Sequence, residues 1–209
     1  WALSPTRQLS GTPGRTVTEL IDACGAREVR GLFILGEDPA MTEPDVNHTK
    51  NCLEQAEFIV LQEIFPSETS RWADVLLPAA AFAEKSGTFT NTDRRVQPVR
   101  KAIDPPGDAR PDWLVLAEIG KAILLEMEAN PAGTHAGRSY DSAAGILDEV
   151  AAVTPSYAGI SWSRVDGGER LQWPVPFAGH PGTPILHVEE STRGRGRFHA
   201  VDHLDPAEL

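Results

Sequence analysis

The stretch Gly31-Leu-Phe-Ile-Leu-Gly-Glu-Asp-Pro39 is an apolar run that stops abruptly at a glycine, two carboxylates and a proline. This composition is typical of a β-strand that ends in a turn facing a ligand. Two further apolar runs follow, over residues 58–62 and 73–78, each after a polar segment long enough for a helix. Strands that alternate with helices in this way predict an α/β fold with a parallel, doubly wound sheet, because such crossovers are right-handed.

Polar and turn residues follow each of the three predicted strands. Ligands of parallel sheets bind outside the carboxyl ends of the strands, so this edge is expected to hold a nucleotide-like ligand. Its carboxylates would repel bare phosphates, but they could accept paired hydrogen bonds from a guanine base or from two ribose hydroxyls. The alternative is that the acidic residues only terminate a strand. The residues expected on this edge are Gly36, Glu37, Asp38, Gln62, Glu63, Pro78 and Ala79.

Helix starts are marked between and after these strands. Ser, Thr and Asp are favoured N-caps, because their side chains accept hydrogen bonds from the first free N–H groups of a helix. Thr16-Val-Thr-Glu19 also matches a capping box, and Pro111 with Asp112 suits the first turn of a long helix. Helices are therefore predicted to begin near Thr16, Asp45, Ser67, Pro111 and Asp141.

The remaining segments carry strand and turn signals. Residues 83–98, with several threonines around a glycine, predict a loop or hairpin. The Gly, Pro and Trp content of residues 154–184 indicates an irregular but ordered region packed by Trp162 and Trp173, since disordered segments are poor in aromatic residues. Apolar runs over residues 184–189 and 196–201 predict a second hairpin.

The composition excludes several classes of protein. With 19 Lys and Arg against 30 Asp and Glu, the 209-residue chain has a net charge of −11, which does not suit a nucleic-acid binder. The basic pairs Arg94-Arg95 and Arg100-Lys101 could meet phosphates or an acidic subunit, but a solvated loop is the simpler interpretation. Cys24 and Cys52 lack metal-ligand spacing, so buried small hydrophobic residues are expected there. Walker, G-x-G-x-x-G and G-x-S-x-G motifs are absent, so no self-contained hydrolase, kinase or ordinary dehydrogenase is indicated.

Several short motifs, in order along nearly the whole chain, resemble those of molybdopterin-dinucleotide oxidoreductases. The similarity is greatest to the large (α) subunit of molybdenum or tungsten formate dehydrogenases. Each motif is weak alone, but the set is specific. The motifs lie at residues 36–39, 61–65, 73–78, 84–95, 110–113, 157–161 and 171–174.

The resemblance implies an α/β lobe that clamps a bis(molybdopterin guanine dinucleotide) cofactor carrying Mo or W. It implies that Asp112 contacts the guanine edge and that Glu63 or Asp38 contacts the ribose. It places no catalytic residue and no metal ligand in this chain. The cofactor-binding residues that it implies are Gly36, Glu37, Asp38, Thr42, Gln62, Glu63, Pro78, Ala79 and Asp112.

The resemblance also implies a segment of a longer subunit, as does the start at Trp1. The metal ligand, the iron–sulfur cysteines and a C-terminal β-barrel would lie outside it, and this segment alone would be inactive. The expected partners are the other domains of the subunit and electron-transfer subunits with iron–sulfur or flavin centres. No nucleic-acid partner and no membrane segment are expected, and the expected location is the cytoplasm. The expected divisions are a linker over 1–15, the α/β lobe over 16–135, its helical or irregular extension over 136–190, and a linker over 191–209.

Two other interpretations stay open. One is a portion of the cofactor-free large subunit of NADH–quinone oxidoreductases, which shares the fold but often loses the nucleotide-contacting residues. Asp38, Gln62 and Asp112 favour the formate dehydrogenase instead. The other is a free-standing guanine-nucleotide-binding or scaffold module, which would leave a sheet edge uncovered.

Overall fold

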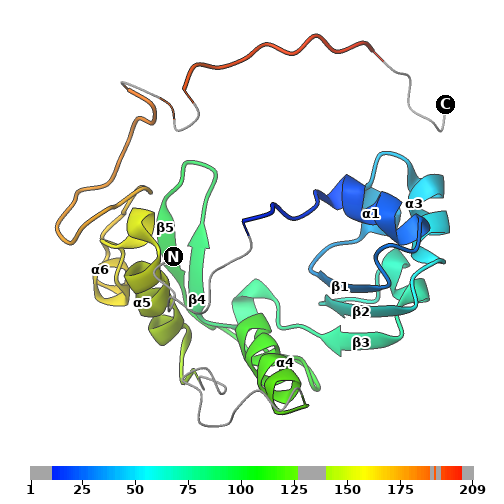
Figure 1. Cartoon of the computed structure of the whole chain (residues 1–209). Helices are drawn as coiled ribbons and strands as arrows, with labels where there is room; N and C mark the ends of the chain where they lie inside the picture. The colour runs from blue at the N-terminus through cyan, green and yellow to red at the C-terminus, as the bar shows by residue number, and fades with distance from the viewer. Residues whose placement is uncertain (1–10, 127–139, 189–190, 192–193, 204–209) are drawn as a thin grey trace. The chain divides into compact units, whose positions relative to one another are not determined.

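The computed structural model describes residues 11–126, 140–188, 191 and 194–203, which divide into two compact units (Figure 1). The sheet unit comprises the described residues up to Ala79, together with Gly107–Ala109 and residues 200–203. The hairpin unit comprises Ala80–Pro106 and the described residues of Arg110–His199.

The sheet unit is built on a three-stranded parallel sheet in the order β1-β2-β3. The three apolar runs form its strands, so the predicted alternation of strands and helices is confirmed. The strands are β1 (Gly31–Leu35), β2 (Phe58–Glu63) and β3 (Val75–Pro78), and the helices are α1 (Val17–Gly25), α2 (Pro39–Thr42), α3 (Val46–Leu53) and the 3-10 helix η1 (Glu68–Trp72).

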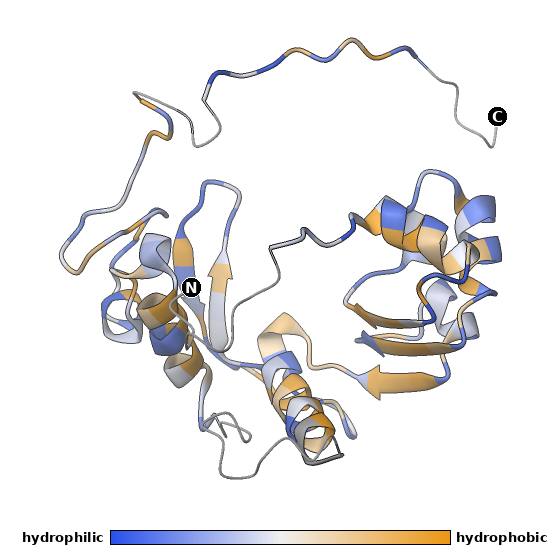
Figure 2. Ribbon diagram, viewed as in Figure 1, coloured by the Kyte–Doolittle hydropathy of each residue, from blue (hydrophilic) through white to orange (hydrophobic). Residues whose placement is uncertain are grey.

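Apolar side chains on one face of this sheet pack against α1, α2 and α3. The strands are mostly apolar, with polar Gln62 and Glu63 at the end of β2, whereas α1 and α3 are mixed (Figure 2). Leu32 and Ile34 of β1 face the helices, while Phe33 and Leu35 alternate with them and are 43% and 39% exposed. The result is a mixed α/β unit with a parallel sheet; helices on both faces remain a prediction. The buried core consists of Ile21, Ala40, Cys52, Leu53 and Ile59.

The predicted helix starts are largely confirmed. Thr16 and Glu19 form both halves of the capping box, and the Asp45 carboxylate accepts from the His48 N–H at 2.9 Å. Ser67 precedes η1 as expected, but its side chain makes no capping bond there, and the element is a short 3-10 helix.

The hairpin unit is held together by its own apolar core. Strands β4 and β5 pair antiparallel, as the sequence predicts, and pack with α5 around Val96 and Leu147. Trp162 and Trp173 pack against the same core, so the predicted aromatic packing is also confirmed. The elements are η2 (Phe82–Glu84), β4 (Gly87–Thr90), β5 (Val96–Val99), α4 (Asp112–Glu126), α5 (Ala143–Val153), η3 (Pro155–Tyr157) and α6 (Trp162–Asp166).

The described residues divide into compact units between Ala79 and Ala80, and the hairpin packs on α5 within its own unit. The expected division between residues 135 and 136 lies outside the described residues and stays a prediction. The hairpin predicted over 184–189 and 196–201 is wrong for the residues described there, which form no strand. The large apolar side chains there, those of Ile185, Val188, Phe198 and Val201, are all exposed, so they do not form the packed face that a hairpin needs. None of the described helices has both the length and the apolar character needed to span a membrane.

Candidate functional site

The ends of the three parallel strands lie side by side at one edge of the sheet. Leu35 of β1 is in register with Gln62 of β2, which is in register with Leu77 of β3, and Glu63 lies opposite Pro78. The predicted shared edge is therefore confirmed. Apart from Asp112, and from Thr42 at the end of α2, the residues nominated as cofactor contacts lie on this edge or on the turn that follows β1.

The turn after β1 is shaped by Gly36. Its φ is +65°, in the left-handed region that a Cβ disfavours, and its N–H donates to the Gln62 carbonyl at 2.9 Å. Glu37 follows with an exposed side chain. The turn thus projects one carboxylate into solvent beside the carboxyl end of β1.

The carboxylate of Asp38 is occupied by the sheet unit itself. It accepts hydrogen bonds from the Thr69 hydroxyl at 2.6 Å, the Thr69 N–H at 2.9 Å and the Glu68 N–H at 3.2 Å. Burial tends to raise the pKa of Asp38, but these bonds outweigh it and lower the pKa below its ordinary value. Asp38 therefore ties the turn to the start of η1, a role that its position after a strand does not reveal.

Thr69 completes this connection. It is fully buried, and its hydroxyl also accepts from the Ala40 N–H at 3.1 Å. Thr42 turns its hydroxyl back onto the Asp38 carbonyl at 3.0 Å. Glu37 and Thr42 help to line a hollow of about 420 Å³ beside β1.

Gln62 and Glu63 end the central strand. Gln62 is fully buried, whereas Glu63 is half-buried and its carboxylate accepts from the Ile64 N–H at 2.6 Å. The Glu63 carbonyl accepts from the Ala79 N–H at 3.0 Å, which fixes the chain as it leaves β3. Of the nominated ribose acceptors, Glu63 thus has fewer hydrogen bonds from the protein than Asp38.

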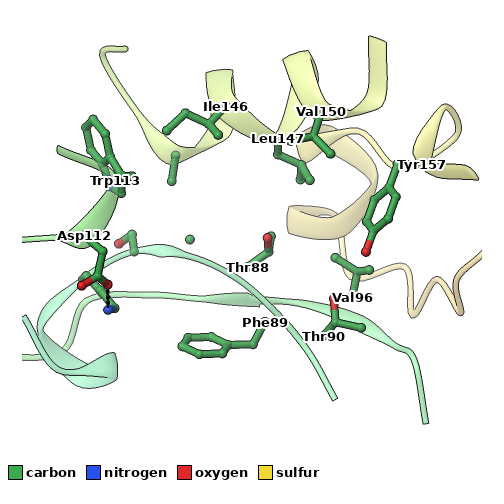
Figure 3. Close-up of a pocket in the computed structure, with 14 residues that line it drawn as sticks. Thr88, Phe89, Thr90, Val96, Asp112, Trp113, Ile146, Leu147, Val150 and Tyr157 are labelled. Carbon is green, nitrogen blue, oxygen red and sulfur yellow. Dashed lines mark hydrogen bonds and ion pairs between the residues drawn. The ribbon is translucent and has the colours of Figure 1, made fainter. Parts of the chain in front are cut away.

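Asp112 lies in the hairpin unit, where it is the first residue of α4. Its Oδ2 forms an ion pair with the Lys85 ammonium group, and both side chains are about one-quarter exposed. The pair lies at one end of a pocket of about 460 Å³ between the hairpin and α5, next to Trp113 (Figure 3). Lys85 was not singled out from the sequence because it lies 27 residues from Asp112 and no local motif links the two.

The basic pairs have structural partners rather than an anion. Arg94 donates to three backbone carbonyls, those of Trp173, Thr183 and Pro184, and so holds the irregular segment against the hairpin. Arg100 forms an exposed ion pair with Asp166. Neither arrangement provides a phosphate site, so the possibility of a phosphate contact gains no support here.

The two cysteines are free and buried, as expected. Burial raises the pKa of both thiols, which keeps them protonated and poorly nucleophilic. Within the described residues, no three His, Cys, Asp or Glu side chains gather in a way that could hold a metal ion.

The model of the molybdopterin oxidoreductase family matches residues 5–122, which is more than half of the chain. The chain therefore belongs to the molybdopterin oxidoreductase family. It is 45% identical over 206 residues to F420-dependent formate dehydrogenase 2 subunit alpha of Methanococcus maripaludis, and 40% identical over 205 residues to F420-dependent formate dehydrogenase subunit alpha of Methanocaldococcus jannaschii.

These matches cover 98% and 96% of this chain but only 29% and 28% of the two relatives. The chain thus spans less than a third of the length of the curated relatives that it matches. Among solved structures, acetylene hydratase from Pelobacter acetylenicus matches 75% of this chain and 20% of its own, with a TM-score of 0.54 and 17% identity. At that identity the likeness concerns the fold alone.

Proposed function

We propose that this chain is the cofactor-binding portion of the α subunit of a molybdenum- or tungsten-dependent formate dehydrogenase. The observation that carries the proposal is the sheet edge, where three parallel strands end in register in a chain of the molybdopterin oxidoreductase family. The relatives named as formate dehydrogenase α subunits support formate as the substrate. Electrons would pass to iron–sulfur clusters outside this segment and then to partner subunits.

The proposed cofactor is a bis(molybdopterin guanine dinucleotide), which when bound would supply the metal centre for formate oxidation. The protein contributes binding and orientation. The sheet edge fits a nucleotide because it offers acceptor groups, and not lysines or arginines, to donor groups of a ligand. We assign nucleotide contacts at this edge to Gly36, Glu37, Thr42, Gln62, Glu63, Pro78 and Ala79, and the guanine contact to Asp112.

Within this set we assign the ribose contact to Glu63 rather than Asp38. A ligand that competed for the Asp38 carboxylate would displace bonds from Thr69 and Glu68 that hold η1. Only the adjacent Ile64 N–H is seen to bond the Glu63 carboxylate within the described chain. Asp38 would then act by positioning the turn that carries Glu37.

Glu63→Gln in the complete subunit tests this assignment, with Glu54→Gln at the exposed end of α3 as the matched control. Loss of a charged acceptor should weaken retention of the cofactor about tenfold or more, since such hydrogen bonds contribute about 1.5–3 kcal/mol. Metal and pterin content per subunit is the measurement. Full cofactor content in Glu63→Gln would refute the contact, and a wild-type subunit without any pterin would favour the cofactor-free relatives.

The isolated 209-residue chain is expected to oxidise no formate with any dye acceptor. The nominated residues bind and orient, and none of them is proposed to ligate the metal or to transfer a proton. Formate-dependent dye reduction by the isolated chain, well above that of a cofactor-only control, would contradict the view that it is only a portion of the enzyme.

A further inference from the structure

Lys85, which has no role in the proposed function so far, forms an ion pair with Asp112 at the end of a pocket with a largely apolar lining. Both side chains are more than two-thirds buried. Most of the other ion pairs in the described chain have at least one partner that is more exposed. Removing two charges from water is costly, so this pair differs from an ordinary surface ion pair and is a candidate for a functional role.

The backbone holds Lys85 firmly on both sides. The Ala81 N–H donates to the Glu84 carboxylate at 2.8 Å, which closes the turn before Lys85. The Lys101 N–H donates to the Ser86 hydroxyl at 3.0 Å, which fixes the turn after it. Lys85 is therefore presented to Asp112 by a fixed segment, and the pair is preorganised before any ligand arrives.

The pocket beyond the pair suits a flat aromatic ring. Ile146, Leu147 and Val150 of α5 form one wall, and the Thr88 side chain of β4 lies opposite them (Figure 3). Trp113 lies beside the ion pair, and Tyr157 lies at the far end. A volume of about 460 Å³ is within the usual range for small-molecule sites, which are mostly apolar with a few placed polar groups.

We propose that Lys85 and Asp112 together read the edge of a guanine base, with Lys85 donating to O6 and Asp112 accepting from N1–H and N2–H. This inference rests on the proposed function, which assigns the guanine contact to Asp112, and it adds Lys85 as a specificity-determining residue. An ammonium group has three donors, so Lys85 can bond Asp112 and O6 together. A carboxylate can accept about four hydrogen bonds, enough for Lys85 and the two guanine donors.

The same pair disfavours adenine. Adenine places an amino group where guanine has O6, so that a donor would face the donors of Lys85. It also places a lone pair at N1, where an acceptor would face the Asp112 carboxylate. Unmatched groups of this kind cost more than the matched ones gain, which is how a buried polar site discriminates between ligands.

The test is the retention of guanine nucleotide by the purified complete holoenzyme. Four variants are compared with wild type: Lys85→Met, Asp112→Asn, the double variant, and Lys101→Met as a control. Lys101 is exposed, pairs with Asp104 and does not line the pocket. Two quantities are measured. The content is the guanine nucleotide per subunit that hydrolysis frees, and the release rate is the loss of this nucleotide from the protein over time, followed by gel filtration.

Lys85→Met should release the nucleotide about tenfold faster or more, while Lys101→Met should match wild type. The double variant should release it about a further tenfold faster than Asp112→Asn alone, because Lys85 has its own contact with the base. The comparison of the double variant with Asp112→Asn stays informative even if Lys85→Met alone folds poorly. Neither of these two proteins has a carboxylate at position 112, so neither leaves a buried charge there unpaired.

Wild-type retention in Lys85→Met would overturn the inference. So would equal release from the double variant and Asp112→Asn, because Lys85 would then act only through Asp112. Failure of the proposed function would look different: the wild-type holoenzyme itself would contain no guanine nucleotide.

Discussion

Replacing Thr69 with valine removes the hydroxyl that joins the turn after β1 to η1 while keeping the shape of the side chain. The change deletes the 2.6 Å bond to the Asp38 carboxylate and leaves the buried Ala40 N–H without its acceptor. A hydrogen bond to a charged group contributes about 1.5–3 kcal/mol, and an unsatisfied buried N–H costs about 1–3 kcal/mol. Thr69→Val should therefore destabilise the sheet unit by about 3–5 kcal/mol.

Hydrogen exchange measures this locally, because the amides of Glu68, Thr69 and Ala40 report opening of the turn and η1. The matched control is Thr49→Val, since Thr49 is 2% exposed and its side chain makes no hydrogen bond to the described residues. The control should change the opening free energy by less than about 1 kcal/mol. Equal, small effects of the two substitutions would refute the structural role given to Asp38 and Thr69.

Asp38, Arg94 and Gly36 can each be tested by a single substitution. Hydrogen bonds lower the pKa of Asp38 in the folded protein. The ionised Asp38 therefore stabilises the fold fully above its unfolded pKa of about 3.9, and this stabilisation is lost as the pH falls through the folded pKa. Asp38→Asn should flatten this acid dependence of the unfolding free energy. Arg94→Ala should cost about 2–4 kcal/mol and expose residues 172–184 to protease, whereas Arg100→Ala, at an exposed pair, should cost under about 1 kcal/mol. Gly36→Ala should cost about 1–2 kcal/mol in thermal unfolding because of its positive φ, and Gly36→Asn less.

Local patterns in the sequence predict much of the sheet unit. The apolar runs give the parallel strands and their common edge, and the capping residues Thr16 and Asp45 give two helix starts. The strands and caps are predicted well because their signals lie within a few residues, and the crossover rule then orders the strands in parallel. The short helix α2 was missed because Pro39–Thr42 has too few residues to show a period.

Features that depend on distant contacts could not be predicted in this way. Asp38 meets Thr69 and Asp112 meets Lys85 only once the chain has folded. Arg94 looks like a solvated charge in the sequence, yet it binds carbonyls 79 to 90 residues away. The hairpin predicted around Gly194 is wrong for the described residues because its apolar side chains, including Phe198 and Val201, are exposed instead of packed.

We propose above all that this chain holds the guanine end of a molybdopterin dinucleotide. The most direct test is to hydrolyse the purified complete subunit, both wild-type and Asp112→Asn, and to identify and quantify the nucleotide that is released. We expect guanine nucleotide together with Mo or W in the wild type, and a loss of both of about tenfold or more in Asp112→Asn. Full guanine nucleotide and metal in Asp112→Asn, or a wild-type subunit that holds metal and pterin without guanine, would contradict the account.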